Sequence, residues 1–442
     1  MWVSHMKRSS VGRESAIWLF LIGLFSMTQI RLVAKIGISE AGMLIAAPIL
    51  FFQDLPSLKR DGVLPLLNFA FIWLGGACLS DWINGSSFAQ MFRGVAVPYV
   101  ICSTVIVIHH FIKNDVRSCK WLIFGLACSS VLSIFIFQRG MAGDMAAEGD
   151  VAGAIERVVG YKLFWAFTIK TWLLLPVQTM YLSVPFFYSF FAVCVASIAA
   201  WLTGGRSSFL VSVFSLVMLI YARKRFRAMR QIKKHIVVVL LVLGGIGAVV
   251  KWGYKYAGQH GYLNEYETKK FERQTQAGDS VLKLLMAGRG EFFISCFAIW
   301  DRPIIGHGSW AIDRRGYTQE FLVKYGTEED IMALRRREDK ISDMGGLATI
   351  PTHSHITTAW LWHGIAGGMF WIYVGILAGK AFIRRLHLVP ELYGYLVIAL
   401  PNIAWDILFS PFGLRTEECL LFTILAMLGK IEKSQRAMGR LW

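Results

Sequence analysis

Apolar runs of 15 to 26 residues recur from one end of the chain to the other, with short polar segments between them. A helix of about 20 apolar residues spans the roughly 30 Å hydrocarbon core of a bilayer. The short alternating segments typical of a membrane barrel are absent from the sequence. The pattern therefore predicts an all-α polytopic membrane protein.

About twelve of these runs are long enough to cross a membrane. The expected crossings are 16–31, 38–53, 63–79, 94–111, 121–137, 162–178, 182–203, 207–222, 235–256, 354–379, 391–409 and 417–430. The sixth and seventh have the least defined boundaries, because 161–203 is one apolar block with a turn expected near Pro176. The first run follows three basic residues without a small-residue cleavage site, so we expect a retained helix and not a signal peptide.

The lysines and arginines favour one orientation in the membrane. With both termini cytoplasmic, the inner segments carry 22 of them and the short outer loops carry 8. The positive-inside rule supports that arrangement. The chain then divides into helices one to nine in 1–256, a large extracytoplasmic loop with short helices in 257–352, and helices ten to twelve in 353–442.

The composition agrees with a membrane location. The net charge is +17, while 55% of the residues are hydrophobic and 17% are charged. In a membrane protein such basic residues gather in cytoplasmic loops and meet anionic headgroups, so we expect the lipid bilayer as a partner and no nucleic acid. The seven cysteines are scattered, and neither a disulfide framework nor metal-ligand spacing follows from them.

The large loop contains a helical pattern in "SVLKLLMAGRGEFFISCFAIW", residues 280–300. Phe293, Cys296, Phe297 and Trp300 fall on one face, which Arg289 shares because it lies four residues before Phe293. An arginine directed into an apolar face needs an anionic partner. That partner is either a ligand or a carboxylate of the loop itself, such as Glu291 or Asp301.

Three histidines stand where this loop meets the tenth expected crossing, in "PTHSHITTAWLWHGIAGG". Thr352 or Ser354 is placed to cap the helix that begins there. The positive end of the helix dipole disfavours a protonated imidazole, and a neutral imidazole can accept a proton as a general base. His353 and His355 point to different sides at this spacing, which suits neither an equivalent pair nor a metal site.

Two neighbouring features have simpler explanations. His363 is expected to pack or form hydrogen bonds, and the glycines Gly364, Gly367 and Gly368 suit close helix packing. Arg206 lies in the turn "TGGRSSFL" at the outer surface. There it serves either as an interfacial anchor or, with exposed backbone amides, as part of a phosphate cradle.

Several of these motifs occur together around one external loop. They are "GR" before an aromatic helix, then "PIIGHG", then His353 eleven residues before Gly364 of "GIAG", with the Gly-Gly-Arg-Ser turn upstream. In this combination, over about 157–368, the chain resembles the O-antigen ligase and O-antigen (exopolysaccharide) polymerase superfamily. The resemblance implies a metal-independent inverting glycosyltransferase without a cofactor, in the bacterial inner membrane. It would transfer a glycan from undecaprenyl pyrophosphate to an acceptor hydroxyl.

The resemblance also implies residue roles. Arg206 and Arg289 match the arginines that hold the pyrophosphate, and His353 matches the catalytic base. Where the family often has asparagine after that histidine, this chain has Ser354, and it has His355 at the next position, which leaves His355 a candidate assistant. Arginine suits the role of pyrophosphate ligand because its guanidinium binds phosphate in a bidentate manner.

The acceptor distinguishes two functions within the family. A polymerase transfers to another lipid-linked glycan, whereas a ligase transfers to lipid A core. The tryptophans of "GHGSW" and "TTAWLWHG" favour a polymerase, with the ligase as the alternative. A function of another class is a secondary transporter or lipid flippase, which would also accommodate Lys170 and Asp406 within the membrane. The sequence shows no internal repeat in support of that alternative.

Overall fold

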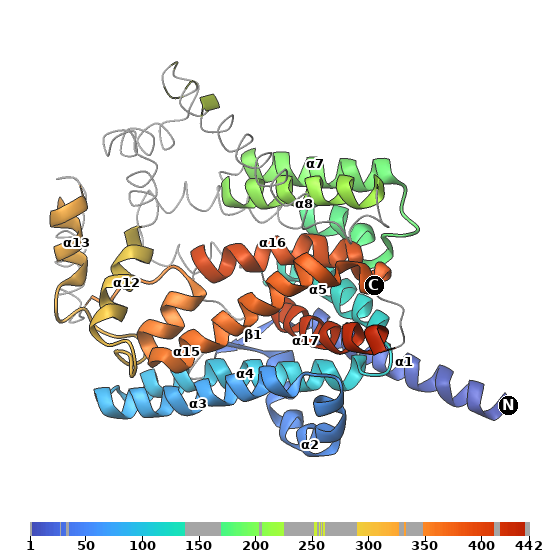
Figure 1. The fold of residues 1–442 in the computed structure, drawn as a ribbon, viewed down its shortest axis with the longest axis horizontal. Coiled ribbons are helices and arrows are strands. Elements are labelled where there is room, and N and C mark those ends of the chain that lie inside the picture. The colour runs from blue at the N-terminus through green and yellow to red at the C-terminus, as the bar shows by residue number, and fades with distance from the viewer. Residues whose placement is uncertain are drawn as a thin grey trace.

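The computed structural model describes residues 2–26, 28–31, 35–137, 169–202, 206–224, 252–253, 256, 258, 260, 290–326, 331–332, 348–410 and 416–437. This part of the chain is predominantly helical (Figure 1). The long helices are α1 (Trp2–Leu24), α2 (Ile38–Arg60), α3 (Leu64–Asn84), α4 (Phe88–Ile112), α5 (Cys119–Phe137), α7 (Phe186–Leu202), α8 (Arg206–Lys224), α15 (His355–Lys380), α16 (Tyr393–Phe409) and α17 (Thr416–Ala437). A short antiparallel hairpin joins β1 (Gln29–Arg31) to β2 (Lys35–Gly37).

The structure supports a membrane protein. Among the described residues, five helical stretches are long and apolar enough to cross a bilayer: Ile38–Arg60, Leu64–Asn84, Phe88–Ile112, His355–Arg385 and Pro390–Phe409. Each other expected crossing overlaps a helix or the helical segment 169–180, apart from 235–256, which lies almost wholly outside the described residues; the crossing expected over 16–31 is helical only to Leu24, since Gln29–Arg31 forms β1.

Aromatic side chains fill the centre of the helix bundle. Trp73 of α3 packs against Phe370 and Trp371 of α15, and Phe422 of α17 contacts both of those rings. All four side chains are fully buried. Large rings bury much apolar area, so this contact fixes α3, α15 and α17 against one another.

Polar contacts join different segments at both ends of the bundle. At one end His109 and Asp61 are 3.0 Å apart, and Arg385 binds Glu432 at 2.7 Å. At the other end Arg302 donates to Asn84. The segments expected in the cytoplasm thus meet one another, and the loop after α3 meets the large loop expected outside.

Helix α15 is broken, contrary to the expectation of one continuous crossing over 354–379. Gly364 has φ +62° and ψ −154°, a positive-φ conformation outside the helical region that favours glycine. The break frees backbone groups that residues of the "PIIGHG" loop then bind: His307 and Gly308 donate to the carbonyls of Leu361 and Trp362. Irregular backbone at membrane depth is tolerated where protein buries it in this way.

The glycines after the break serve close packing, as expected, but within α15 itself. A Cβ on Gly367 would lie 2.3 Å from the carbonyl oxygen of Ala359, and one on Gly368 would lie 2.4 Å from the ring of Trp360. Only glycine lets the two halves of the helix approach so closely. The partner of the glycine face is therefore the first half of the same helix.

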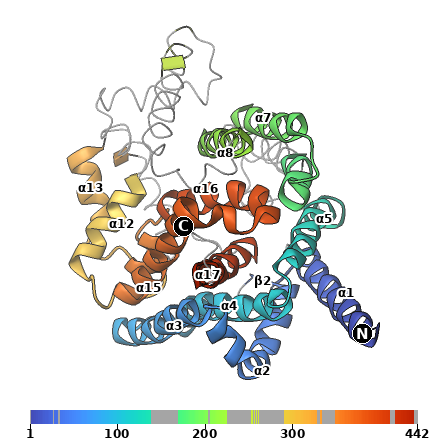
Figure 2. The same cartoon turned by 45° about the vertical axis from the view of Figure 1, so that its right-hand side comes forward.

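The described part of the large loop packs onto the start of α15 (Figure 2). It contains α12 (Gly290–Asp301) and α13 (Tyr317–Tyr325). The helix expected over 280–300 is confirmed for its described part from Gly290 onward, and its expected apolar face is correct only in part. Phe293, Ile294 and Ala298 belong to a small core around Tyr317, Phe321 and Trp362, whereas Cys296, Phe297 and Trp300 are exposed.

Candidate functional site

His353 and Glu291 form a pair at the expected outer end of the bundle. His353 lies in the extended segment before α15, and Glu291 lies in the first turn of α12. The imidazole Nδ1 is 3.0 Å from the carboxylate Oε2, and the two side chains are 39% and 48% exposed. When the Nδ1–H group donates a hydrogen bond to the carboxylate, Nε2 is unprotonated and can accept a proton on the side away from the pair.

The local structure holds the two residues together. Ser354 is the N-cap of α15, and its hydroxyl oxygen accepts from the Thr357 backbone N–H, so the expected cap is confirmed at Ser354. The Ser295 hydroxyl on α12 donates to the Pro351 carbonyl at 2.9 Å. This bond ties α12 to the segment that carries His353.

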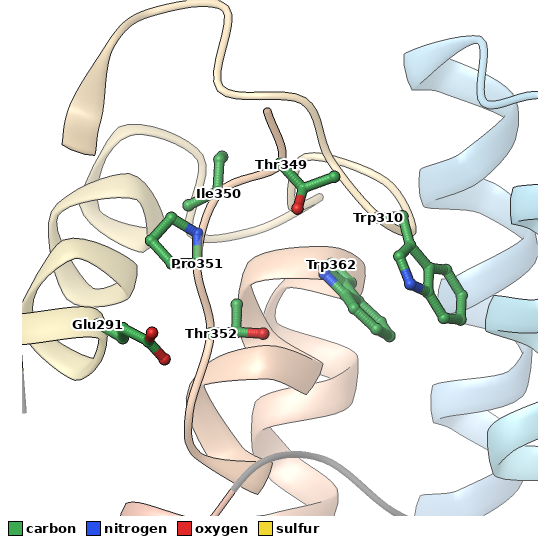
Figure 3. A pocket seen from close by; sticks show the side chains of 7 residues that line it. All are labelled: Glu291, Trp310, Thr349, Ile350, Pro351, Thr352 and Trp362. Atoms are coloured by element: carbon green, nitrogen blue, oxygen red, sulfur yellow. The ribbon is translucent and has the colours of Figure 1, made fainter. Parts of the chain in front are cut away.

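A pocket of about 240 Å³ lies beside this pair. Its lining residues are Glu291, Trp310, Thr349, Ile350, Pro351, Thr352 and Trp362 (Figure 3). Figure 3 shows the two indole rings side by side, with Thr352 and the carboxylate of Glu291 on the side of Trp362 away from Trp310. Glu291 therefore belongs both to the pocket wall and to the pair with His353.

The two tryptophans are stacked, with ring centroids 4.4 Å apart and planes at 30°. Trp310 has φ +51°, a left-handed conformation that is rare for a bulky residue. Such backbone persists only where surrounding contacts enforce it. The residues next to these two tryptophans in sequence, Ser309 and His363, supply those contacts.

Ser309 and His363 belong to a buried hydrogen-bond chain. Trp73 Nε1 donates to His363 Nδ1 at 2.8 Å, so the neutral imidazole carries its proton on Nε2, which donates to the Ser309 hydroxyl oxygen at 2.8 Å. That hydroxyl donates to Asp81 Oδ2, and the Ser309 backbone N–H donates to Asp81 Oδ1. The hydrogen-bonding role expected for His363 is what the structure shows.

This series of hydrogen bonds differs from the catalytic triad of a serine hydrolase. In a triad the histidine stands between serine and aspartate and removes the serine proton. Here Ser309 lies between His363 and Asp81. Its hydroxyl donates a hydrogen bond to Asp81, and its side chain is buried. The arrangement anchors the backbone and presents no nucleophile.

His355 lies apart from the pocket. It is 2% exposed, its Nδ1 donates to the Asp406 carbonyl at 2.6 Å, and its ring packs edge-on against Trp371. Glu418 approaches its Nε2 at 3.7 Å. The side chain therefore sits between α15, α16 and α17, on the other side of the chain from His353.

The two candidate arginines are only partly covered by the described residues. Arg289 lies outside them and directly precedes Gly290, where α12 begins. The backbone of Arg206 begins α8, which runs antiparallel to α16: Tyr393 donates to the Met218 carbonyl, and Ser215 to the Val397 carbonyl. This register places the start of α8 near the end of α16, where Phe409 contacts Phe292 beside Glu291.

Two ionisable groups support the loop near the pocket. Arg315 and Tyr317 bind Asp301 and hold the pKa of its carboxyl below the usual range. Burial lowers the pKa of His307, although its bond to the Ala298 carbonyl acts in the opposite direction. A neutral His307 Nε2–H thus donates to α12 at neutral pH.

Comparisons with family models, with curated proteins and with solved structures find no match for this chain. Within the described part of the chain, no group of three histidine, cysteine or carboxylate side chains is placed to hold a metal ion. The sequence did not single out Glu291 as the partner of His353, or Asp81 and Ser309 as an anchor. Their positions in sequence carry no local signal, because each pairs with a residue far along the chain.

Proposed function

We propose that this protein is a metal-independent inverting glycosyltransferase of the O-antigen ligase/polymerase type, with a polysaccharide polymerase as the leading function. The observation that carries the proposal is the pair of Glu291 and His353 at the mouth of a pocket lined by tryptophan and hydroxyl groups. A carboxylate-bound imidazole next to a cavity is suited to remove a proton from a bound hydroxyl.

In the proposed reaction, His353 Nε2 takes the proton of the acceptor hydroxyl as its oxygen attacks the anomeric carbon. The bond from that carbon to the pyrophosphate oxygen breaks on the opposite face, which inverts the configuration. Glu291 orients the ring and stabilises the imidazolium that forms. Arg206 and Arg289, assigned by resemblance, would hold the departing pyrophosphate, since fixed donors stabilise developing charge in a poorly hydrated site.

We further propose the inner membrane of a bacterium as the location, with twelve transmembrane helices, both termini cytoplasmic and the site on the periplasmic side. The contacts at the two ends of the bundle support this topology, because segments assigned to one side lie together. A donor on that side has to be lipid-linked, since nucleotide sugars are confined to the cytoplasm.

The test is transfer by purified protein supplied with undecaprenyl-pyrophosphate-linked glycan. We expect release of undecaprenyl pyrophosphate and lengthened glycan, unchanged by added chelator and absent with His353→Ala. A transporter or flippase would release no undecaprenyl pyrophosphate in detergent, and that result would overturn the proposal. In a deletion strain, single repeat units on lipid A core indicate a polymerase, whereas long chains left on the carrier lipid indicate a ligase.

A further inference from the structure

The pocket next to the Glu291–His353 pair is lined by two chemically different kinds of side chain. Trp310, Trp362, Ile350 and Pro351 form the apolar part, whereas Glu291 and the hydroxyls of Thr349 and Thr352 form the polar part. A pyranose ring has matching surfaces: faces of C–H groups and a rim of hydroxyls. Aromatic faces are electron-rich and attract such C–H groups, and carboxylate and threonine oxygens accept from hydroxyls.

The size of the pocket favours one ring. Its volume of about 240 Å³ lies below the roughly 300 Å³ at which sites for drug-sized ligands begin. A monosaccharide unit fits within that limit, and an oligosaccharide would have to extend out of the opening. The pocket therefore suits a single sugar of a longer glycan.

The stacked tryptophans are held in place before any ligand binds. Ser309 is fixed by Asp81 and directly precedes Trp310, while His363 is fixed by Trp73 and directly follows Trp362. The left-handed backbone of Trp310 is enforced by these buried bonds. A binding wall that is fixed in advance loses less entropy when a ligand docks.

We propose that this pocket binds one pyranose ring of the acceptor glycan, with the Trp310–Trp362 pair as its apolar wall, so that Trp310 determines acceptor affinity. The inference rests on the proposed glycosyl transfer. Because Glu291 lines the pocket and also binds His353, a ring seated there brings its rim hydroxyls towards the imidazole. The ring in the pocket is therefore assigned to the acceptor glycan. The alternative is that the pocket binds the first sugar of the lipid-linked donor.

Steady-state kinetics with Trp310→Ala separate these sources. We expect the KM for the acceptor glycan to rise about tenfold, equivalent to roughly 1.4 kcal/mol, with the KM for the lipid-linked donor unchanged. Trp310→Phe keeps an aromatic face and should stay within about threefold of wild type. Trp300→Ala is the matched control, since Trp300 is 88% exposed on α12 and lies outside the pocket. A rise in donor KM alone would overturn the assignment to the acceptor.

Saturation-transfer NMR with the free repeat-unit oligosaccharide tests binding without transfer. We expect ring-proton signals with wild type, His353→Ala and Trp300→Ala, and their loss with Trp310→Ala and with the space-filling Trp310→Leu. If wild type transfers glycan but Trp310→Ala and Trp310→Leu bind and react normally, the sugar site is wrong while the proposed function stands. If wild type binds the oligosaccharide in this pocket but transfers nothing, the proposed function fails while the sugar site stands.

Discussion

The carboxylate of Glu291 lies 3.0 Å from Nδ1 of His353, across 62 residues of sequence. This contact joins the first turn of α12 to the segment that enters α15. It leaves the other imidazole nitrogen available on the side of the pair away from the carboxylate. In the proposed transfer Glu291 is therefore a positioning residue for His353, and its charge would complement the imidazolium that proton transfer creates.

Glu291→Gln should lower kcat about ten- to a hundredfold, which is part of the roughly 10²- to 10⁴-fold effect of general acid–base catalysis. Glutamine keeps the side-chain length but cannot stabilise the imidazolium. The KM for the donor should change little, because the pyrophosphate is held elsewhere. Initial rates of undecaprenyl pyrophosphate release measure both constants.

Glu320→Gln is the control for that substitution, since Glu320 is an exposed carboxylate on α13 in the same loop. It should leave kcat unchanged. Glu291→Asp retains the charge and should restore part of the lost rate. An unchanged kcat in Glu291→Gln would show that the ion pair has no role in transfer.

His353→Ala and His355→Ala should have different effects. Loss of His353 should abolish transfer while the protein still folds, because its side chain is 39% exposed. Loss of His355 should leave measurable transfer but lower the free energy of unfolding by about 1–3 kcal/mol, since it removes a buried hydrogen bond to Asp406. Transfer assays with thermal unfolding of both variants check this, and reversed outcomes would show that the base is misassigned.

The helix positions could be predicted because each helix has its own apolar run. The expected range 38–53 lies within α2, which extends further at its C-terminal end, and the range 94–111 lies within α4, which extends further at both ends. The break in α15 could not be predicted, because Gly364 also fits a packing glycine. Its unusual backbone is stabilised by bonds from a loop some 60 residues earlier and from Ser80 of α3.

The site was foreseen in the same uneven way. Histidines at a helix start are visible in the sequence, so His353 could be proposed. The apolar face of α12 was predicted correctly only at Phe293, because an amphipathic pattern does not say which surface another segment will cover. The small core to which α13 and α15 contribute determines which side of α12 is buried.

Arg206→Lys and Arg289→Lys should each lose most of the transfer activity. Lysine keeps the positive charge but cannot offer the planar pair of donors that binds a pyrophosphate oxygen pair. The loss should be specific to arginines at these positions. Arg314→Lys, at an exposed arginine of the described loop, should leave the rate unchanged, and normal rates in both test variants would remove the pyrophosphate-binding assignment.

Acidification should destabilise the loop through His307. Burial lowers the pKa of His307 in the folded protein, whereas an unfolded histidine titrates near about 6.5. Below that pH the unfolded chain binds the proton more readily, so the free energy of unfolding falls as the pH falls. The stabilisation is fully present above the unfolded pKa.

Thermal unfolding of wild type and His307→Gln at pH 8 and pH 5.5 measures this effect. The midpoint should fall less with pH in the variant, because glutamine does not titrate. His260→Gln, which changes an exposed histidine, should retain the wild-type dependence. Equal pH dependence in wild type and His307→Gln would contradict the assignment.

Gly364→Ala should destabilise the protein by about 1–3 kcal/mol. Its φ of +62° disfavours any side chain, and an added Cβ would lie 1.9 Å from the Ile304 carbonyl oxygen. Relief of that overlap would separate α15 from the loop that binds its broken backbone, and would displace Trp362 at the pocket.

Gly375→Ala is the matched change in the second half of the same helix, where nothing lies within 4 Å of the added Cβ. It should raise stability by about 0.5–1 kcal/mol, since glycine is unfavourable within a helix. Unfolding in detergent should therefore move in opposite directions for the two variants, and a neutral Gly364→Ala would mean that the break in α15 does not depend on this contact.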